Sequence, residues 1–223
     1  MKIRLILILC LFKSTNFKAQ NFSFSLSGKG MLSGSLILNN SITTNENQDY
    51  AFAMSGSGGI GGLFLFDDKI GASVEILIGN HKGKYNGTTT MDNQKYSSVI
   101  NLKTVQIPLL FRLDNEEGYL EIGPQLNVLT NAEFSSNYLF GITSDVTDKY
   151  KRVSTSGVIG FGSFHQLGRR SPLTLTFGFR INYGFSDIKG VDPQGTSFSI
   201  STASQKSILL SAGLNVGLLY ELK

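Results

Sequence analysis

Apolar and small polar residues alternate along most of the chain. In the segment 173–185, Leu, Phe, Ile and Tyr occupy the odd positions, while Thr, Gly, Arg and Asn occupy the even ones. A period of two is the pattern of a β-strand with one apolar face. Similar alternation predicts eight strands, at 22–38, 52–66, 70–80, 99–113, 118–131, 153–166, 173–185 and 208–222.

The connections between these strands alternate in length. Short polar turns lie at 67–69, 114–117 and 167–172, and the longer connections span 39–51, 81–98, 132–152 and 187–206. An even number of long strands, with short turns at one end and long loops at the other, is typical of outer-membrane barrels. The sequence therefore predicts an all-β fold, an eight-stranded antiparallel up-and-down transmembrane β-barrel located in the cell outer membrane.

The solvent explains this pattern. No backbone group can stay unpaired in hydrocarbon, so a sheet crosses a bilayer only when it closes on itself. Lipid then requires an apolar outer face, while eight strands enclose an interior just wide enough for side chains. Because strands need only about 9–11 residues to cross, we expect the wall to extend past the bilayer on the long-loop side. A soluble lipocalin-like barrel is the alternative, but it gives no reason for connections that alternate in length.

The N-terminal segment has the features of a secretory signal peptide. Lys2 and Arg4 precede an apolar stretch at 5–12, and the segment ends in Ala19-Gln20. We therefore expect a signal peptide at 1–20 and a β-barrel domain at 21–223; a buried N-terminal helix is the alternative. The single cysteine, Cys10, lies in the signal, so the mature chain has to be stable without disulfides.

The positive net charge also belongs to this segment. The chain has 20 Lys and Arg against 16 Asp and Glu, a formal charge of +4. Residues 1–20 contain four basic residues and no acid, so the mature chain is formally neutral. The nucleic-acid partner that a basic chain would favour is thereby excluded.

Several charged and amide side chains fall on the inward face of the predicted strands. They are Glu75, Gln106, Arg112, Glu121, Gln125, Asn127, Arg180 and Asn182. Charges inside a narrow lumen must be paired, because burying an isolated charge is very costly. We predict a salt-bridged polar network that fills the interior; a gated conduction path through the same residues is the alternative.

Candidate cofactor and catalytic motifs are weak. Residues 56–61 satisfy the glycine-rich dinucleotide fingerprint, but that site requires a helix after the glycines and here a strand pattern continues. His81 near Ser97 and Ser98 would have to face the lipid to form a hydrolase of membrane lipids, and no motif supports it. We therefore expect neither a cofactor nor an enzyme.

Metal binding is equally unsupported. No cysteine remains in the mature chain to join the two histidines, which are predicted at opposite ends of the barrel. Four acidic residues of the long loops match no Ca²⁺ loop and are interpreted as solvated charge: Asp145, Asp148, Asp187 and Asp192. Aromatic residues at the short-turn ends are expected to form a girdle at the membrane surface: Phe64, Phe66, Phe111, Tyr119 and Tyr220.

Two adjacent strands resemble a known family. Residues 102–110 read L-K-T-V-Q-I-P-L-L, and residues 118–125, after a short acidic turn, read G-Y-L-E-I-G-P-Q. This pair of motifs resembles the PorT-like outer-membrane β-barrel family of Bacteroidetes-type bacteria. The resemblance implies location and fold far more than an activity; the family was named for a member associated with type IX protein secretion.

The expected role is therefore non-enzymatic. We expect an outer-membrane anchor, or an accessory of an envelope assembly such as protein secretion, with a narrow channel for small solutes as the alternative. The expected partners are outer-membrane lipid and lipopolysaccharide, secretion-system or other envelope proteins, and the barrel-assembly machinery. That machinery would recognise the alternating final strand at 214–222.

Overall fold

The computed structural model describes residues 22–39, 42, 48–67, 69–88, 93–137, 141–168, 171–191 and 206–222. The predicted signal peptide lies outside these residues. The strands and one short 3₁₀ helix are β1 (Ser23–Asn39), β2 (Gln48–Ala51), β3 (Ala53–Asp67), β4 (Ile70–Thr88), β5 (Lys95–Asp114), β6 (Gly118–Ser136), β7 (Ile142–Asp145), η1 (Thr147–Lys149), β8 (Val153–Gln166), β9 (Leu173–Gly184) and β10 (Ser207–Leu222). No helix in the described part of the chain is long and apolar enough to cross a membrane.

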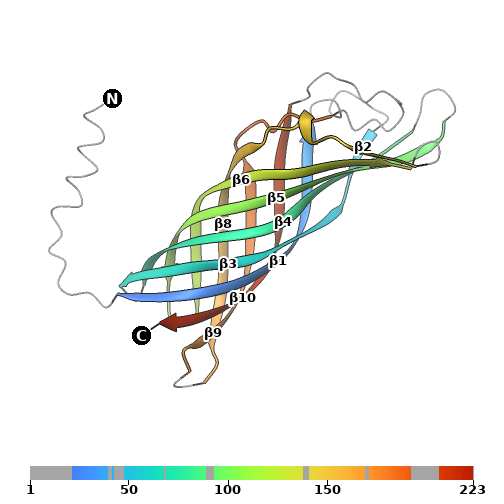
Figure 1. Ribbon diagram of the computed structural model, residues 1–223. Helices are drawn as coiled ribbons and strands as arrows, with labels where there is room; N and C mark the ends of the chain where they lie inside the picture. Colours follow the sequence, from blue (N-terminus) through green and yellow to red (C-terminus); the bar gives the residue numbers. More distant parts are fainter. Residues whose placement is uncertain are drawn as a thin grey trace, which may run out of the picture.

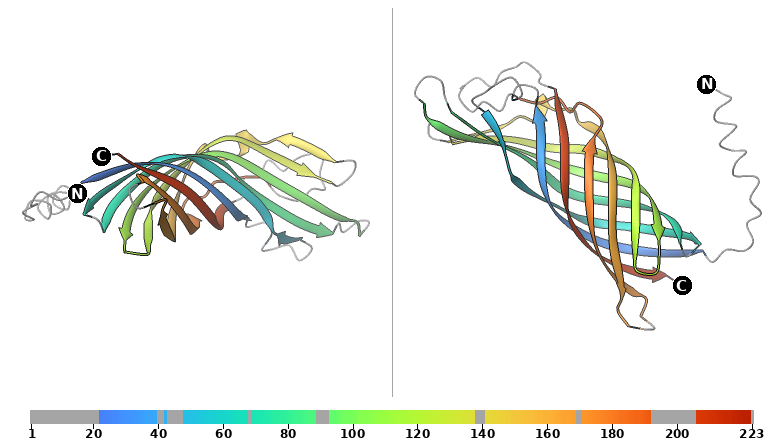
Figure 2. Two further views of the ribbon diagram at one scale, coloured as in Figure 1. Left: turned by 90° about the horizontal axis from the view of Figure 1, so that it is seen from below. Right: turned by 180° about the vertical axis from the view of Figure 1, so that it is seen from behind.

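Eight of the ten described strands close into a ring (Figures 1 and 2). In ring order they are β1, β3, β4, β5, β6, β8, β9 and β10, each antiparallel to the next. The ring closes between the first and last strands, where Phe24 lies opposite Leu222 and Asn39 opposite Ser207. The predicted eight-stranded up-and-down barrel is confirmed, with β2 and β7 added outside the ring.

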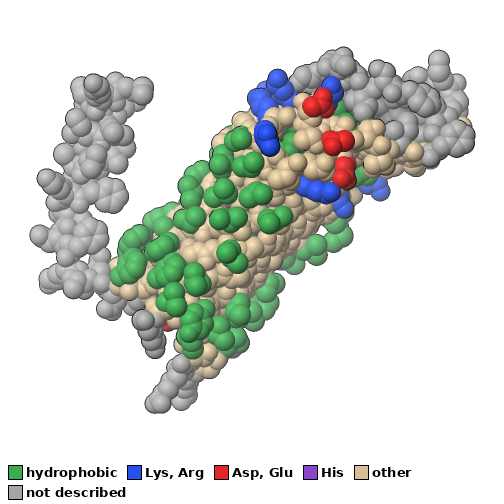
Figure 3. All heavy atoms as spheres, in the orientation of Figure 1, with side chains coloured by type: hydrophobic (Ala, Val, Ile, Leu, Met, Phe, Trp, Pro, Cys, Tyr) green, Lys and Arg blue, Asp and Glu red, His purple; other side chains and the backbone are tan. Residues whose placement is uncertain are grey.

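The two faces of the wall have opposite polarity, as the alternation predicts. On β4, Val74, Ile76 and Ile78 point outward and are exposed, whereas Ser73 and Glu75 point inward and are buried. Exposed apolar side chains cover the outside of the short-turn part of the barrel in Figure 3. Such a belt is stable next to hydrocarbon and unfavourable in water.

Three neighbouring strands run further than the sequence predicts. β4, β5 and β6 have 19, 20 and 19 residues, so much of the predicted loops 81–98 and 132–152 is strand. The prediction was wrong here because the outward residues change from apolar to polar at Asn80, Lys82 and Lys84, which removes the apolar half of the alternation. Charged side chains gather on this part of the surface in Figure 3.

The short strands β2 and β7 extend this projecting region. β2 pairs with β4 and β7 pairs with β6, which gives a five-stranded sheet in the order β2, β4, β5, β6, β7. We call it the rim sheet. It runs past the remaining strands at the long-loop end (Figures 1 and 2).

The interior at the long-loop end is apolar, whereas the sequence predicted a polar network that fills the interior. Its buried residues, called the upper core, are Ile37, Ile42, Tyr85, Ile100, Leu102, Leu129, Ala132, Phe134, Val146, Tyr150, Ile188, Val191 and Leu209. Val146, Tyr150, Ile188 and Val191 come from the long connections and pack onto strand residues. Outside the bilayer the outer face meets water, so the hydrophobic effect moves apolar side chains to the inside.

Candidate functional site

All seven predicted interior residues are buried on the inward face of the ring. None is more than 3% exposed: Glu75, Gln106, Arg112, Glu121, Gln125, Arg180 and Asn182. The structure brings Glu75, Glu121 and Arg180 together in one cluster and leaves the other four outside it. Asn127, the eighth residue assigned to this face, is buried as well.

The cluster is a charged quartet that bridges the lumen: Lys29, Glu75, Glu121 and Arg180. Arg180 donates from Nη1 to Glu75 Oε2 at 2.7 Å and from Nη2 to Glu75 Oε1 at 2.8 Å, and from Nε to Glu121. Lys29 donates to Glu75 and lies 4.0 Å from Glu121 Oε2. Two positive and two negative charges make the quartet neutral, so each buried charge has a partner.

The quartet is one layer of the barrel. Its members come from β1, β4, β6 and β9, which are alternate strands of the ring. Three of the strands between them supply glycines directly opposite: Gly61 faces Glu75, Gly160 faces both Glu121 and Arg180, and Gly217 faces Lys29.

These glycines make room for the charges. A Cβ on Gly160 would lie 2.6 Å from Glu121 Oε1, and one on Gly61 would lie 2.8 Å from the Cγ of Glu75. A Cβ on Gly217 would lie 3.0 Å from the Cγ of Lys29. Large charged and very small residues thus alternate around the layer except at β5, which has no glycine, and this arrangement fills the narrow interior without overlap.

Lys29 is the member of the quartet that sequence reasoning missed. Its signal was present, because Lys29 occupies the odd, mostly serine row of the first strand, and that row faces inward. It is an isolated charge among serines. A buried charge needs a partner of opposite sign, and because β1 contains no acidic residue, that partner has to come from another strand.

Arg112 lies apart from the quartet, toward the short-turn end. Its Nε donates to Asp114 Oδ1 at 2.6 Å, and its guanidinium stacks 4.0 Å from the centre of the Tyr119 ring. Tyr119 is 5% exposed and donates to Asn215 inside the barrel. Its predicted place in the outer girdle is therefore wrong, because even and odd positions of β6 face opposite sides; Phe66, Phe111 and Tyr220 do point outward.

The amides form smaller contacts nearer the long-loop end. Gln125 donates to Asn127, which donates to Ser156 at 3.1 Å. Asn182 donates to Ser211 at 3.1 Å. They position the strands through side-chain pairs on the inner face.

His81 lies within β4 and faces inward, so its predicted loop position is wrong. It is 1% exposed, and Gln106 donates to its Nε2 at 3.0 Å. Ser98 is also buried inside, and Ser97 lies on the rim opposite Asn86. A lipid at the outer wall therefore cannot meet His81 and Ser98 together, which removes the geometry that a lipid hydrolase would need.

Loop acids are held by backbone groups or lysine. Asp187 Oδ1 accepts from the backbone N–H of Lys189 and Ser207, at 2.8 and 2.9 Å. Asp145 accepts from Thr147, and Asp148 pairs with an adjacent lysine. Asp192 lies outside the described residues. In the described part of the chain, no three His, Cys, Asp or Glu side chains gather as a metal site would require.

The glycine-rich segment 56–61 is strand throughout. It lies inside β3, which runs on to Asp67, so the helix that a dinucleotide site requires is replaced by β-structure. Gly59 and Gly61 face inward, and a Cβ on Gly59 would lie 2.0 Å from the carbonyl oxygen of Ile76. The motif therefore serves close strand packing.

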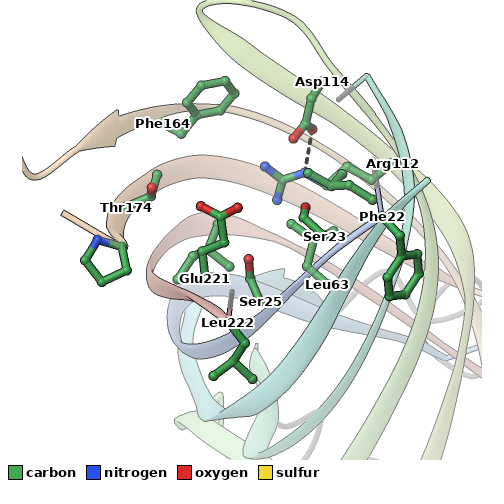
Figure 4. Close-up of a pocket in the computed structure, with 13 residues that line it drawn as sticks. Phe22, Ser23, Ser25, Leu63, Arg112, Asp114, Phe164, Thr174, Glu221 and Leu222 are labelled. Atoms are coloured by element: carbon green, nitrogen blue, oxygen red, sulfur yellow. Dashed lines mark hydrogen bonds and ion pairs between the residues drawn. The ribbon is translucent and has the colours of Figure 1, made fainter. Parts of the chain in front are cut away.

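Two cavities show how far the interior is filled. At the long-loop end a cavity of about 20 Å³ remains between His81, Tyr150 and Leu209, which is about enough for one water. At the short-turn end an open vestibule of about 760 Å³ lies between Arg112 and Glu221 (Figure 4). We call it the lower vestibule.

Comparisons with known proteins agree with this architecture. A family model described as the outer membrane protein beta-barrel domain matches residues 15–190. No curated protein sequence matches the chain.

Several solved structures are similar. Neisserial surface protein A of Neisseria is 14% identical, with a TM-score of 0.42, over 90% of this chain and 99% of that chain. OprG of Pseudomonas aeruginosa is 13% identical, with a TM-score of 0.44, over 91% and 96%. Ail of Yersinia pestis is 13% identical, with a TM-score of 0.38, over 89% and 99%.

The family match covers most of the chain, including seven of the eight ring strands. The closed ring, the outward apolar belt and the polar interior are what a barrel needs in a bilayer. The chain belongs to the outer membrane protein beta-barrel domain family and is a β-barrel protein of the outer membrane.

Proposed function

We propose that this barrel is a closed, non-enzymatic membrane anchor. Bacterial outer-membrane barrels have short periplasmic turns and long extracellular loops, so the rim sheet would stand at the cell surface. The anchor would hold the rim sheet there for contact with lipopolysaccharide or with another envelope protein.

Closure of the lumen is the observation that carries this proposal. The charged quartet crosses the interior from alternate strands, and the upper core fills the long-loop end with apolar side chains. An ion would have to break buried ion pairs and then pass an apolar region, and both steps are unfavourable. A narrow channel is the competing function.

Conductance of the refolded protein in a planar bilayer tests the proposal. We expect no reproducible current steps from the unmodified barrel. Reproducible steps that are abolished when Glu75 and Arg180 are changed together would overturn it, because the quartet would then be a conduction path. A matched control is the exposed pair Lys103 and Glu133, 2.9 Å apart on the outside of the barrel, whose change should leave the current unaffected.

We further propose that the chain is a PorT-like accessory of protein export. The motifs at 102–110 and 118–125 support this assignment, and they build the adjacent strands β5 and β6 of the rim sheet. Assembly would proceed through the barrel-assembly machinery and the final strand β10. The role predicts that cells lacking the protein export less protein across the outer membrane, and unchanged export would contradict it.

A further inference from the structure

The lower vestibule has the size and lining of a ligand site. Its volume of about 760 Å³ falls within the range of about 300–1,000 Å³ that is usual for ligand pockets. It opens at the short-turn end, which is periplasmic in such barrels. Apolar walls come from Leu63, Leu65 and Phe164, and polar groups come from Arg112, Thr174 and Glu221.

Arg112 presents an unused pair of donors to this space. The side chain is 2% exposed and fixed on two sides, by Asp114 at Nε and by the Tyr119 ring at 4.0 Å. Nη1 and Nη2 have no hydrogen-bond partner within the part of the chain that the structure describes, and they point into the vestibule (Figure 4). A rigid guanidinium fork in this state matches a carboxylate, which accepts two parallel hydrogen bonds.

Glu221 determines which second polar group a ligand of the vestibule needs. Its carboxylate points into the same space from β10 (Figure 4), and no ion pair engages it among the described residues. One arginine against the carboxylates of Asp114 and Glu221 makes the vestibule unfavourable for a simple anion. A ligand that also brings an ammonium or amide N–H group would satisfy Glu221.

We propose that the lower vestibule binds a short apolar peptide with a free C-terminal carboxylate. The Arg112 fork receives the carboxylate, Glu221 accepts from the peptide's ammonium or amide N–H, and Leu63, Leu65 and Phe164 contact its apolar side chains. The peptide enters from the periplasm. This site goes beyond the anchor role, and its test does not depend on conductance or export.

Tryptophan fluorescence offers a clean test because the chain contains no tryptophan. The probe is the tripeptide Leu-Trp-Leu, titrated into the full-length barrel refolded in detergent micelles. We expect a saturable blue shift of the peptide's emission. Amidation of the peptide C-terminus should weaken binding by about tenfold or more, because it removes a charge-assisted pair of hydrogen bonds, and N-acetylation should weaken it less.

Variants assign the two ends of the peptide. Arg112→Gln should reduce the affinity for the free acid to that for the amide and leave the amide's affinity unchanged. Glu221→Gln should weaken peptides with a free ammonium more than N-acetylated peptides. Arg152→Gln, at the long-loop end, is the matched control and should bind normally. Gel mobility of unboiled protein shows whether each variant is folded. If Arg112→Gln does not fold, the difference in affinity between the acid and the amide peptide, measured on the unmodified barrel, still tests the proposal.

Any of three results with the peptide would overturn the proposal. They are the absence of a blue shift at millimolar peptide, equal affinities for the acid and the amide, and full affinity in folded Arg112→Gln. Decanoate distinguishes a fatty carboxylate from a peptide. If decanoate displaces nothing, the peptide assignment stands; if it binds as tightly as the peptide, the N–H contacts to Glu221 are unnecessary and the assignment fails.

Discussion

Buried charge in this barrel depends on very small neighbours. Each large ionic side chain of the quartet lies next to a cross-strand glycine, as Glu121 and Arg180 lie next to Gly160. By contrast, a Cβ on the outward Gly28 or Gly30 would meet nothing within 4 Å. Gly61, Gly160 and Gly217 are therefore required by packing against the quartet, whereas Gly28 and Gly30 are not.

Loss of one quartet charge should be strongly destabilising. Arg180→Gln would leave Glu75 and Glu121 with Lys29 as the remaining quartet cation, and breaking a buried pair in this way costs about 3–5 kcal/mol. Urea unfolding of the barrel in lipid vesicles measures the change. The double variant Arg180→Gln with Glu121→Gln restores neutrality and should recover part of the loss.

The exposed pair Lys103 and Glu133 provides the control for this experiment. Its side chains are 51% and 40% exposed, so Lys103→Gln should change the free energy of unfolding by about 0–1 kcal/mol. Equal losses for Arg180→Gln and Lys103→Gln would contradict the structural role of the quartet.

Sequence reasoning succeeded for these residues only in part. Alternation along each strand is local, so it placed Glu75, Glu121 and Arg180 on the inward face. It could not show that Arg180 reaches Glu75, because 105 positions separate them along the chain. Lys29 was missed although the same alternation places it on the inward face of β1; its pairing with acids of other strands could not be seen from the sequence.

At the scale of elements, β4 shows how one continuous strand passes from lipid into water at the long-loop end. β4 keeps its period of two from Ile70 to Thr88, but its outward row becomes polar above Ile78 and its inward row gains Tyr85. The strand is continuous while its solvent changes from lipid to water. A boundary drawn at the last apolar residue therefore marks the end of the apolar belt and not the end of the strand.

The loop that closes the upper core is tied to β10 by Asp187, which makes it sensitive to acid. Partial burial favours a higher pKa for this carboxyl group, but hydrogen bonds from Ser207 and Lys189, together with the charges of Lys151 and Lys206, hold the pKa below its ordinary value. A lowered folded pKa stabilises the loop above about pH 4, the unfolded value. That contribution is lost as the pH falls through the folded pKa.

Hydrogen exchange measures this effect. Protection of the Ser207 and Lys189 amides, corrected for intrinsic rates, should fall by about two- to fivefold on acidification from about pH 6 to below the folded pKa, as expected for a partly exposed group. Asp187→Asn should give equal protection at both pH values. Asp148→Asn is the control, because Asp148 is mostly exposed and pairs with an adjacent lysine. A fall of the same size in Asp187→Asn would assign the acid sensitivity to another group.

At the scale of the whole molecule, the apolar belt fixes where the barrel sits in the membrane. The outward row of β4 runs from Ile70 through Val74 to Ile78, and Asn80 follows on the same face. Val74 lies in the middle of the belt and Asn80 lies above it. The projecting rim sheet, with its charged outer face, then stands outside the bilayer.

Lysine substitutions on this row test the placement. Val74→Lys should reduce the free energy of unfolding in vesicles by about 2–4 kcal/mol, the cost of a lysine near the bilayer centre, whereas Asn80→Lys should cost about 0–1 kcal/mol. Both side chains point away from the quartet. Because Asn80 accepts from the Gly56 N–H and donates to Asn101, Asn80→Ala measures the loss of these hydrogen bonds separately from the cost of the lysine. Equal costs at the two positions would show that the bilayer does not end between them.

The sequence by itself determined the eight ring strands, their up-and-down order, the lipid-facing row and the inward row. These features follow from contacts of each residue with its solvent, and a period of two along one strand records them. Only the tertiary structure decided that Lys29 completes a neutral quartet, that the upper interior is apolar, and that Arg112 leaves two donors facing a vestibule. Each of these depends on the register between strands far apart in the chain, which is fixed only when the ring closes.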